Sequence, residues 1–284
     1  PAIHSLQCMG TTRLLVAIDG RIVNESELGV SPFDHGLLTG DGIFETVRVY
    51  RGAPFALRRH LDRLARSAQR MDLAVPADLR AVCAEVIAAN DIAEGRLRIT
   101  LTGGPGPLGS ARGSAGPTCI VAAEPVHAWP ATTDVVTVEW PRNERGALAG
   151  VKSTSYGENV VAWKYAVEKG AGEAIFGNTV GNLCEGTGSN IFVVINDELL
   201  TPPLHSGCLA GVTRDLIIEI TGAAERDIPL ASLVDVEEAV LTSTTREVQP
   251  ISAVDGSALP AAPGRHARRA AELFSELLAR TQDP

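Results

Sequence analysis

The segment at residues 42–57, GIFETVRVYRGAPFAL, restricts the fold of this chain most, because a strand pattern runs directly into a helix pattern. In the strand pattern one set of side chains alternates with another: Ile43, Glu45, Val47 and Val49 against Phe44, Thr46, Arg48 and Tyr50. After it the period changes, and apolar side chains recur on one helical face at Leu57, Leu61, Leu64 and Ala68. The segment therefore predicts a strand followed by an amphipathic helix.

The rest of the first half continues this mixture. Residues 13–23 predict a hairpin around the turn Asp19-Gly20, since Asp-Gly between two apolar runs is a strong hairpin signal. Residues 76–90 predict a second amphipathic helix, and residues 95–102 and 118–125 predict strands. Residues 1–8 carry no periodicity, and we interpret them as an expression remnant or an extended start. The first half is predicted to be α+β.

Residues 124–134, EPVHAWPATTD, contain two prolines and little periodicity, and predict an interdomain linker. They divide the chain into a small N-terminal α+β domain, residues 1–123, and a larger C-terminal domain, residues 135–284. In the larger domain we expect strands at 135–140, 173–177, 189–195, 239–243 and 247–252, and helices over 159–170, from about 213 and from about 264. The predicted class is a two-domain α+β or α/β protein.

Composition excludes several classes of function. The formal net charge of -9 and the pI near 5.2 argue against nucleic acid as the main partner, because phosphate backbones require a basic surface. The five cysteines are scattered and the six histidines show no metal-ligand spacing, so we expect a reducing cytoplasm and no metal site. No apolar run of membrane-spanning length and no export signal stand out, so we expect no membrane partner. Small molecules are the expected partners.

The sequence gives no support for nucleotide binding or ester hydrolysis. GPGPLG at 104–109 matches Gly-x-Gly-x-x-Gly, but the segment behind it opens no helix that could hold a pyrophosphate, so we interpret it as a loop. The chain has no P-loop and no Gly-x-Ser-x-Gly nucleophile motif.

Lysine is rare, and its positions point to chemistry. The chain has Lys152, Lys164 and Lys169 and no others. A primary amine can form a Schiff base with an aldehyde, whereas a guanidinium cannot. Lys164 and Lys169 lie late in a predicted helix, where cations favour the helix dipole. Lys152 follows four small or apolar residues, where partial burial would lower its pKa, so it is the candidate nucleophile.

Three further segments supply partners for such a lysine. Glu185 in NLCEGTGSNIF is a lone carboxylate among apolar residues, which favours pairing with a buried cation. In CLAGVTRD at 208–215 a glycine turn precedes Thr213 at a helix start, which offers free N–H groups to an anion. LTSTTRE at 241–247 adds a second hydroxyl cluster. An amine, a carboxylate and a phosphate cradle are the groups that pyridoxal 5'-phosphate requires of a protein.

Order and spacing of these motifs resemble a known family. The chain resembles the fold-type IV, class IV pyridoxal-phosphate aminotransferases, a group that includes D-amino-acid aminotransferases, branched-chain aminotransferases and 4-amino-4-deoxychorismate lyase. The resemblance extends from about residue 16 to residue 255 through GDGIFETVRVY, HLDRL, LAGVKSTSY, EGTGSNIF, LAGVTRD and TSTTREVQPI. It implies the fold-type IV two-domain architecture, in which the C-terminal domain binds the cofactor.

The resemblance also implies residue roles. Lys152 would bond to the cofactor aldehyde and shuttle the proton, Glu185 would partner the pyridine nitrogen, and Tyr156 would donate to the ring 3'-oxygen. The phosphate ligands would be Arg63, Val212, Thr213, Ser243 and Thr244. Helical periodicity alone places Arg63 off the apolar stripe, as a solvated residue.

Substrate specificity is the least determined property. We expect amino transfer from an amino acid, with D-amino acids favoured and (R)-amines as further candidates, to a keto acid such as 2-oxoglutarate or pyruvate. The alternatives are the lyase, which would release pyruvate, and a branched-chain L-amino-acid aminotransferase. D-amino-acid aminotransferases carry an Arg-x-His pair in the loop that here reads GGPGPLGSARG without a histidine. The candidates for binding the substrate carboxylate are therefore Arg48, Arg98 and Arg112. The resemblance implies that Phe44 lines the substrate side and that the protein is a homodimer.

Overall fold

The computed structural model describes residues 14–27 and 29–284, so our interpretation of residues 1–8 lies outside the described residues. Of the hairpin predicted at 13–23, the described part is confirmed, with β1 (Leu15–Ile18) antiparallel to β2 (Arg21–Asn24). Its two turn residues, Asp19 and Gly20, have φ values of 47° and 78°. A two-residue turn with both φ angles positive matches the twist of the flanking strands, which explains the Asp-Gly sequence.

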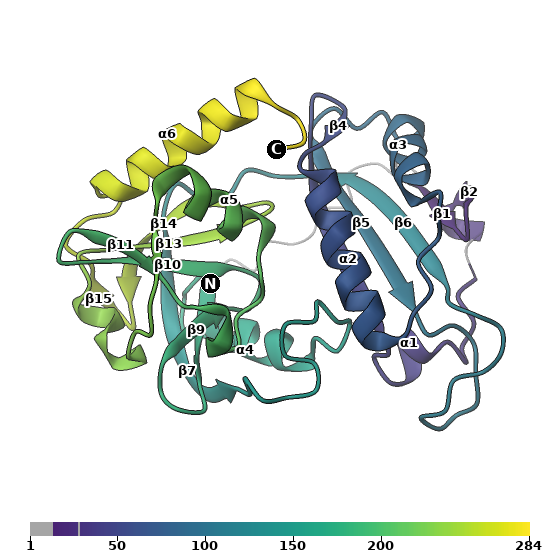
Figure 1. Cartoon of the computed structure of the whole chain (residues 1–284), viewed down its shortest axis with the longest axis horizontal. Helices are drawn as coiled ribbons and strands as arrows, with labels where there is room; N and C mark the ends of the chain where they lie inside the picture. Colours follow the sequence, from purple (N-terminus) through teal and green to yellow (C-terminus); the bar gives the residue numbers. More distant parts are fainter. Residues whose placement is uncertain (1–13, 28) are drawn as a thin grey trace.

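The first part of the described chain builds one mixed unit (Figure 1). Its strands form a six-stranded sheet in the order β2, β1, β6 (Cys119–Pro125), β5 (Gly95–Thr102), β3 (Gly42–Tyr50) and β4 (Ala53–Pro54). Its helices are the 3-10 turn η1 (Glu25–Glu27), α1 (His35–Leu38), α2 (Leu57–Met71) and α3 (Leu79–Ala89). The predicted strands and both predicted amphipathic helices are present.

The alternation in β3 separates two environments. Ile43 and Val47 pair in register with Leu101 and Leu97 of β5, and all four side chains are fully buried in the core beneath α2 and α3. The opposite set, Phe44 and Thr46, pairs with Thr100 and Arg98 on the other face of the sheet. One strand therefore supplies both the core of this unit and the wall of a pocket.

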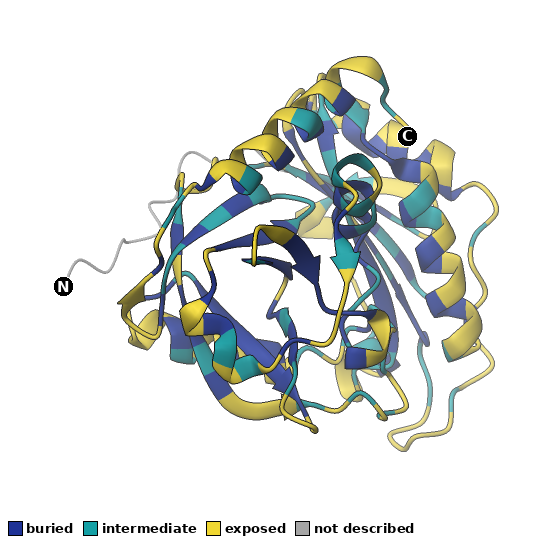
Figure 2. Cartoon of the chain, turned by 60° about the vertical axis from the view of Figure 1, so that its left-hand side comes forward, coloured by how far each residue is buried: buried dark blue, intermediate teal, exposed yellow. Residues whose placement is uncertain are grey.

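The second part of the described chain builds a larger unit around a nine-stranded sheet. The strand order is β12 (Ala224–Glu225), β11 (Glu198–Thr201), β10 (Asn190–Ile195), β13 (Glu238–Ser243), β14 (Glu247–Val254), β7 (Thr133–Arg142), β8 (Glu173–Asn178) and β9 (Leu183–Gly186), with β15 (Ser257–Ala258) paired to β14. The helices are α4 (Gly157–Glu168), η2 (Leu204–Ser206), α5 (Val212–Thr221), η3 (Leu230–Asp235) and α6 (Arg265–Arg280). Figure 2 shows buried strands behind helices whose outer faces are exposed.

The linker and the C-terminal tail are two of the connections between the units. Residues 126–132 lead from β6 to β7, inside the linker predicted at 124–134; the division into independent domains stays a prediction. After α6, the C-terminal tail returns to the first unit, where the Ala56 amide donates to the Gln282 carbonyl at 2.9 Å (Figure 1). Phe55 also stacks edge-on against Phe274 of α6, with ring centroids 5.9 Å apart. The tail and α6 therefore join the C-terminal end of the chain to the start of α2.

Two general findings concern the described residues. No helix among residues 14–27 and 29–284 is long and apolar enough to cross a membrane. Cys83, Cys119, Cys184 and Cys208 are buried free thiols.

Leu97 tests the core assignment of the six-stranded sheet. Its side chain is 0% exposed, so Leu97→Ala should lower the free energy of unfolding by about 2–5 kcal/mol through lost burial and a cavity. Val180, 63% exposed, is the control, and Val180→Ala should change the free energy of unfolding by less than about 0.5 kcal/mol. Denaturant unfolding measures both. A cost below about 1 kcal/mol for Leu97→Ala would contradict the assignment.

Candidate active site

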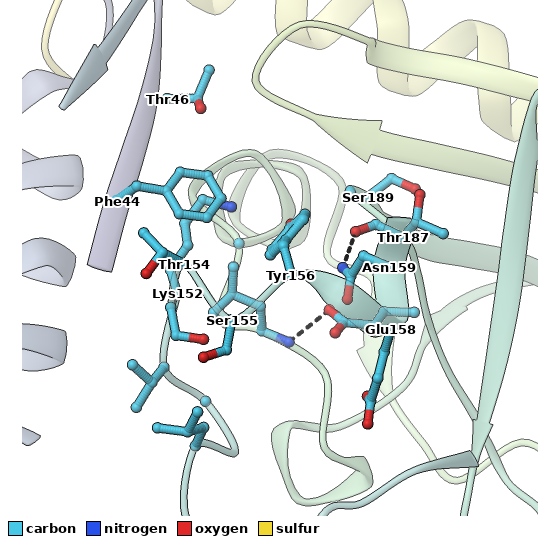
Figure 3. A pocket seen from close by; sticks show the side chains of 18 of the residues that line it. Phe44, Thr46, Lys152, Thr154, Ser155, Tyr156, Glu158, Asn159, Thr187 and Ser189 are labelled. Carbon is cyan, nitrogen blue, oxygen red and sulfur yellow. Dashed lines mark hydrogen bonds between the residues drawn. The ribbon is translucent and has the colours of Figure 1, made fainter. Parts of the chain in front are cut away.

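A cavity of about 1010 Å³ is lined by residues of both units. It gathers most of the predicted site residues. Those predicted to act on the reacting atoms or the substrate side are Lys152, Glu185, Tyr156, Phe44 and Arg98. Those predicted to hold the phosphate are Arg63, Val212, Thr213, Ser243 and Thr244. Figure 3 shows Phe44 and Lys152 on one side of the pocket, Thr187 and Ser189 on the other, and Tyr156 between them.

Backbone hydrogen bonds to β3 position Lys152. The Phe44 amide donates to the Lys152 carbonyl at 2.9 Å, and the Thr154 amide donates to the Gly42 carbonyl at 2.8 Å. The segment therefore pairs with the first half of β3. It lies on the same edge of the strand on which the second half pairs with β4. Gly150, with φ 77°, provides the left-handed turn before it. As a result, Lys152 Nζ lies 4.4 Å from the centre of the Phe44 ring.

The surroundings of Lys152 favour its neutral amine. Burial lowers the pKa of the ammonium first, and the nearby Arg63 charge lowers it further, to about 8, against the opposing effect of Glu45 and Glu185. An amine attacks an aldehyde only when it is deprotonated. Lys164 and Lys169 lie on α4 and its C-cap, and Lys164 pairs with Glu168 at 3.7 Å.

Glu185 lies at the end of β9, in the wall of the cavity. Its Oε1 accepts from Arg142 Nε at 3.2 Å and its Oε2 accepts from the Leu209 amide at 2.9 Å. Burial raises the pKa of this carboxyl, and Arg142 opposes that shift. Arg142 itself lies over the Phe176 ring at 4.1 Å and donates to Asn159 Oδ1 at 2.9 Å. A carboxylate held in this way could pair with a cationic ring nitrogen.

Tyr156 occupies the N-cap position of α4 and packs edge-on against Phe44, with ring centroids 5.3 Å apart. Burial raises the pKa of its phenol, so the hydroxyl stays protonated and can donate a hydrogen bond.

The N-terminus of α5 forms an anion cradle. Gly211 is the N-cap and supplies no side-chain oxygen, so the first helical N–H groups have no capping partner. Free N–H groups and the helix dipole attract phosphate. Ser243 and Thr244 line the same cavity. Together with the buried hydroxyl of Thr242, which has no hydrogen-bond partner among the described residues, they fit the phosphate of pyridoxal phosphate.

The solvated position expected for Arg63 from helical periodicity is wrong. Arg63 is buried and donates to Glu45 from Nε at 2.7 Å and from Nη2 at 2.6 Å, and its Nη1 donates to the Ala210 carbonyl at 2.9 Å. His60 Nδ1 lies 2.8 Å from the same Glu45 carboxylate. Burial would raise the pKa of Glu45, but Arg63 and His60 outweigh it and lower that pKa to about 2. The α2 helix thus buries a polar row beside its apolar stripe.

Sequence reasoning missed a second buried network behind the cavity. Glu173 on β8 accepts from the Thr187 hydroxyl and, at 3.0 Å, from the Ser189 hydroxyl, and it pairs with Arg246 at 3.4 Å. Arg246 stacks on Trp129 of the connecting segment at 3.8 Å. The only sequence signal was Glu173 itself, a carboxylate in an apolar strand.

Two predicted substrate residues do not reach the cavity of this chain. Arg48 donates to the Gly95 carbonyl at 3.0 Å and to Glu94 at 3.2 Å. Arg112 donates to both carboxylate oxygens of Asp41 at 2.6 Å. Both guanidinium groups are paired elsewhere. Across residues 14–27 and 29–284 no group of three or more His, Cys, Asp or Glu side chains could hold a metal ion.

Comparisons with known proteins agree with this geometry. Residues 42–254 match the family model of amino-transferase class IV. A protein of Methanocaldococcus jannaschii, provisionally named a branched-chain-amino-acid aminotransferase, is 34% identical over 253 residues, covering 85% of this chain and 88% of the relative. The D-alanine aminotransferase of Staphylococcus haemolyticus is 30% identical over 259 residues, covering 85% and 89%. The branched-chain aminotransferase of Thermoproteus uzoniensis, solved with norvaline, has a TM-score of 0.86 at 30% identity, covering 95% and 96%.

The pKa of Lys152 predicts how pH controls reaction of the apo-protein with pyridoxal phosphate. Because the lysine must lose its proton first, the rate should rise about tenfold per pH unit below pH 8 and level off above it. Stopped-flow visible absorbance measures this rate. Lys152→Ala should abolish the signal and Lys164→Ala should leave it unchanged. A profile that continues to rise to the ordinary lysine pKa of about 10.4 would contradict the assignment.

Proposed function

The chain belongs to the class IV aminotransferases, which use pyridoxal phosphate, and we propose that it transfers the amino group of an α-amino acid, with D-amino acids favoured, to a keto acid such as 2-oxoglutarate or pyruvate. The D-alanine aminotransferases among its relatives support the preferred enantiomer. (R)-amines are further candidate donors.

The position of Arg98 is the observation that best supports an amino acid as the substrate. Its guanidinium lies over the Phe44 ring, with Cζ 3.7 Å from the ring centre, and Phe44 is the ring that Lys152 contacts from 4.4 Å. Arg98 lines the cavity and forms no ion pair within the described part of the chain. Guanidinium binds a planar carboxylate through two parallel hydrogen bonds. Arg98 is therefore the group that we assign to the substrate carboxylate.

The other roles follow from position in the cavity. We assign the covalent bond to Lys152, the ring nitrogen to Glu185 and the ring oxygen to Tyr156. Arg63, Val212, Thr213, Ser243 and Thr244 are assigned to the phosphate. Arg63 is held by Glu45, which fixes the direction of its remaining Nη1 at the turn before α5.

The chemistry divides between the cofactor and the chain. Bound pyridoxal phosphate supplies an aldehyde for the amine and a ring that withdraws electrons from the substrate Cα. With the cofactor bound, Lys152 would take the proton from the substrate Cα and return it to the carbon that bore the aldehyde, which its low pKa permits near neutral pH. Glu185 would stabilise positive charge on the ring nitrogen, and Phe44, which contacts both Lys152 and Tyr156, would help to keep water from the amine.

We also propose a homodimer that works in the cytoplasm. Phe33, Leu37 and Leu108 are 51%, 68% and 75% exposed on segments that hydrogen-bond to one another, since the Gly106 amide donates to the Phe33 carbonyl at 3.0 Å. Exposed apolar clusters of this kind mark interaction surfaces. The buried free thiols suit a reducing compartment.

A donor and acceptor panel tests the reaction. D- and L-amino acids and (R)-amines, each with 2-oxoglutarate or pyruvate, should give turnover that depends on the keto acid, fastest with D-amino acids. Turnover only with L-branched-chain amino acids would overturn the stereochemical proposal. Pyruvate released from 4-amino-4-deoxychorismate without any amino acceptor would identify the lyase instead.

Arg98→Met tests the carboxylate assignment. Loss of a charged hydrogen-bonding partner, about 1.5–3 kcal/mol, should raise KM for amino acids by at least about tenfold and leave amines, which have no carboxylate, nearly unaffected. Arg96 is the matched control on the same sheet face, because its guanidinium already pairs with Glu124 at 2.7 Å. Equal effects of Arg98→Met and Arg96→Met would refute the assignment.

Light scattering on the purified protein tests the homodimer. We expect a mass of twice 29.8 kDa, and Leu37→Glu with Leu108→Glu should weaken the association. An active monomer would contradict this proposal.

A further inference from the structure

The hydroxyl of Thr242 is an unsatisfied polar group at the cavity wall. Thr242 lies in β13 and is 1% exposed, and its Oγ1 has no hydrogen-bond partner among the described residues. A buried hydroxyl without a partner costs about 1–3 kcal/mol. Other hydroxyls near it differ: Ser243 Oγ accepts from the Arg246 amide at 3.2 Å, and the Thr244 side chain is more accessible.

Strand register places Thr242 beside the N-terminus of α5. It pairs with Asn190 of β10, whose side-chain amide donates to the Leu209 carbonyl at 2.9 Å, just before that helix. The Gly211 Cα packs closely on Asn190, because a Cβ built on Gly211 would lie 2.0 Å from Asn190 Oδ1. Thr242, Asn190 and Gly211 all line the same cavity.

Two kinds of hydrogen-bond donor without a partner meet at this end of the cavity. The uncapped N–H groups of α5 need an acceptor, and the Thr242 hydroxyl can donate its proton. A phosphate group offers several acceptor oxygens and negative charge, which the helix N-terminus favours. Two carboxylates lie near that position, and both already have partners: Asp215 in the first turn of α5 pairs with Arg214 at 3.3 Å, and Glu185 accepts from Arg142 and the Leu209 amide.

We propose that Thr242 is a further phosphate-binding residue, whose Oγ1–H donates to the phosphate of pyridoxal phosphate alongside the N-terminus of α5. This inference depends on the cofactor and not on which amino acid is the substrate. The unpaired hydroxyl therefore destabilises the apo-protein, and the phosphate of the bound cofactor would give it a hydrogen-bond partner.

Thr242→Val separates this role from a structural one, because valine keeps the shape and removes the hydroxyl. The apo-protein should be as stable as the wild type or more stable in denaturant unfolding. The dissociation constant for pyridoxal phosphate, from absorbance titration of the apo-protein, should rise about tenfold. Thr242→Ser should bind the cofactor within about threefold of the wild type.

Thr201 provides the matched control. It is also fully buried, in β11 of the same sheet, but its hydroxyl already donates to the Ile191 carbonyl at 2.8 Å. Thr201→Val should destabilise apo- and holo-protein equally and change cofactor affinity by less than about twofold. Apo Thr242→Val that loses as much stability as Thr201→Val would overturn the proposal.

Pyridoxal without the phosphate is the second probe. Thr242→Val should leave its dissociation constant within about twofold of the wild type, because the missing hydroxyl faces only the phosphate. Unchanged affinity for pyridoxal phosphate, or equal losses for both compounds, would overturn the assignment. If wild-type apo-protein bound neither compound, both the Thr242 proposal and the cofactor assignment would fail. A wrong choice of amino donor would leave the binding results unchanged.

Discussion

Two backbone hydrogen bonds between β3 and the segment around Lys152 are the constraint on which the rest of the site depends. Because Phe44 and Gly42 bond to Lys152 and Thr154, the amine is fixed relative to the strand and not only relative to its own loop. The same strand sends Glu45 to the opposite face, where it holds Arg63. A single strand thus positions both the amine and Arg63, the guanidinium that we assign to the phosphate.

Charge pairing explains how so many ionised groups lie around one cavity. Glu45 pairs with Arg63, Glu185 with Arg142, and Glu173 with Arg246, so each of these three carboxylates has an arginine partner. Buried ions are tolerated when they are paired and hydrogen-bonded. Lys152 has no such partner at salt-bridge distance among the described residues, and burial together with the Arg63 charge outweighs the attraction of Glu45 and Glu185 and lowers its pKa.

Local patterns predicted more of this molecule than long-range contacts did. The alternation in β3 and the Asp-Gly turn could be read from neighbouring residues, and the structure confirms both. The scarcity of lysine pointed to Lys152, which lines the cavity. Arg63 could not be placed, because its burial depends on Glu45, 18 positions earlier on another element. The role of Arg142 could not be predicted for the same reason, since its partner Glu185 is 43 positions away. The pairings of Arg48 and Arg112 are likewise tertiary.

The most direct measurement is to reduce the holo-protein with borohydride, digest it and locate the cofactor by mass spectrometry. Reduction converts a labile bond between lysine and the cofactor into a stable one, so the modified residue can be identified. The account predicts a single pyridoxyl group on the peptide that contains Lys152. Modification of Lys164 or Lys169 instead, or of no lysine, would contradict it.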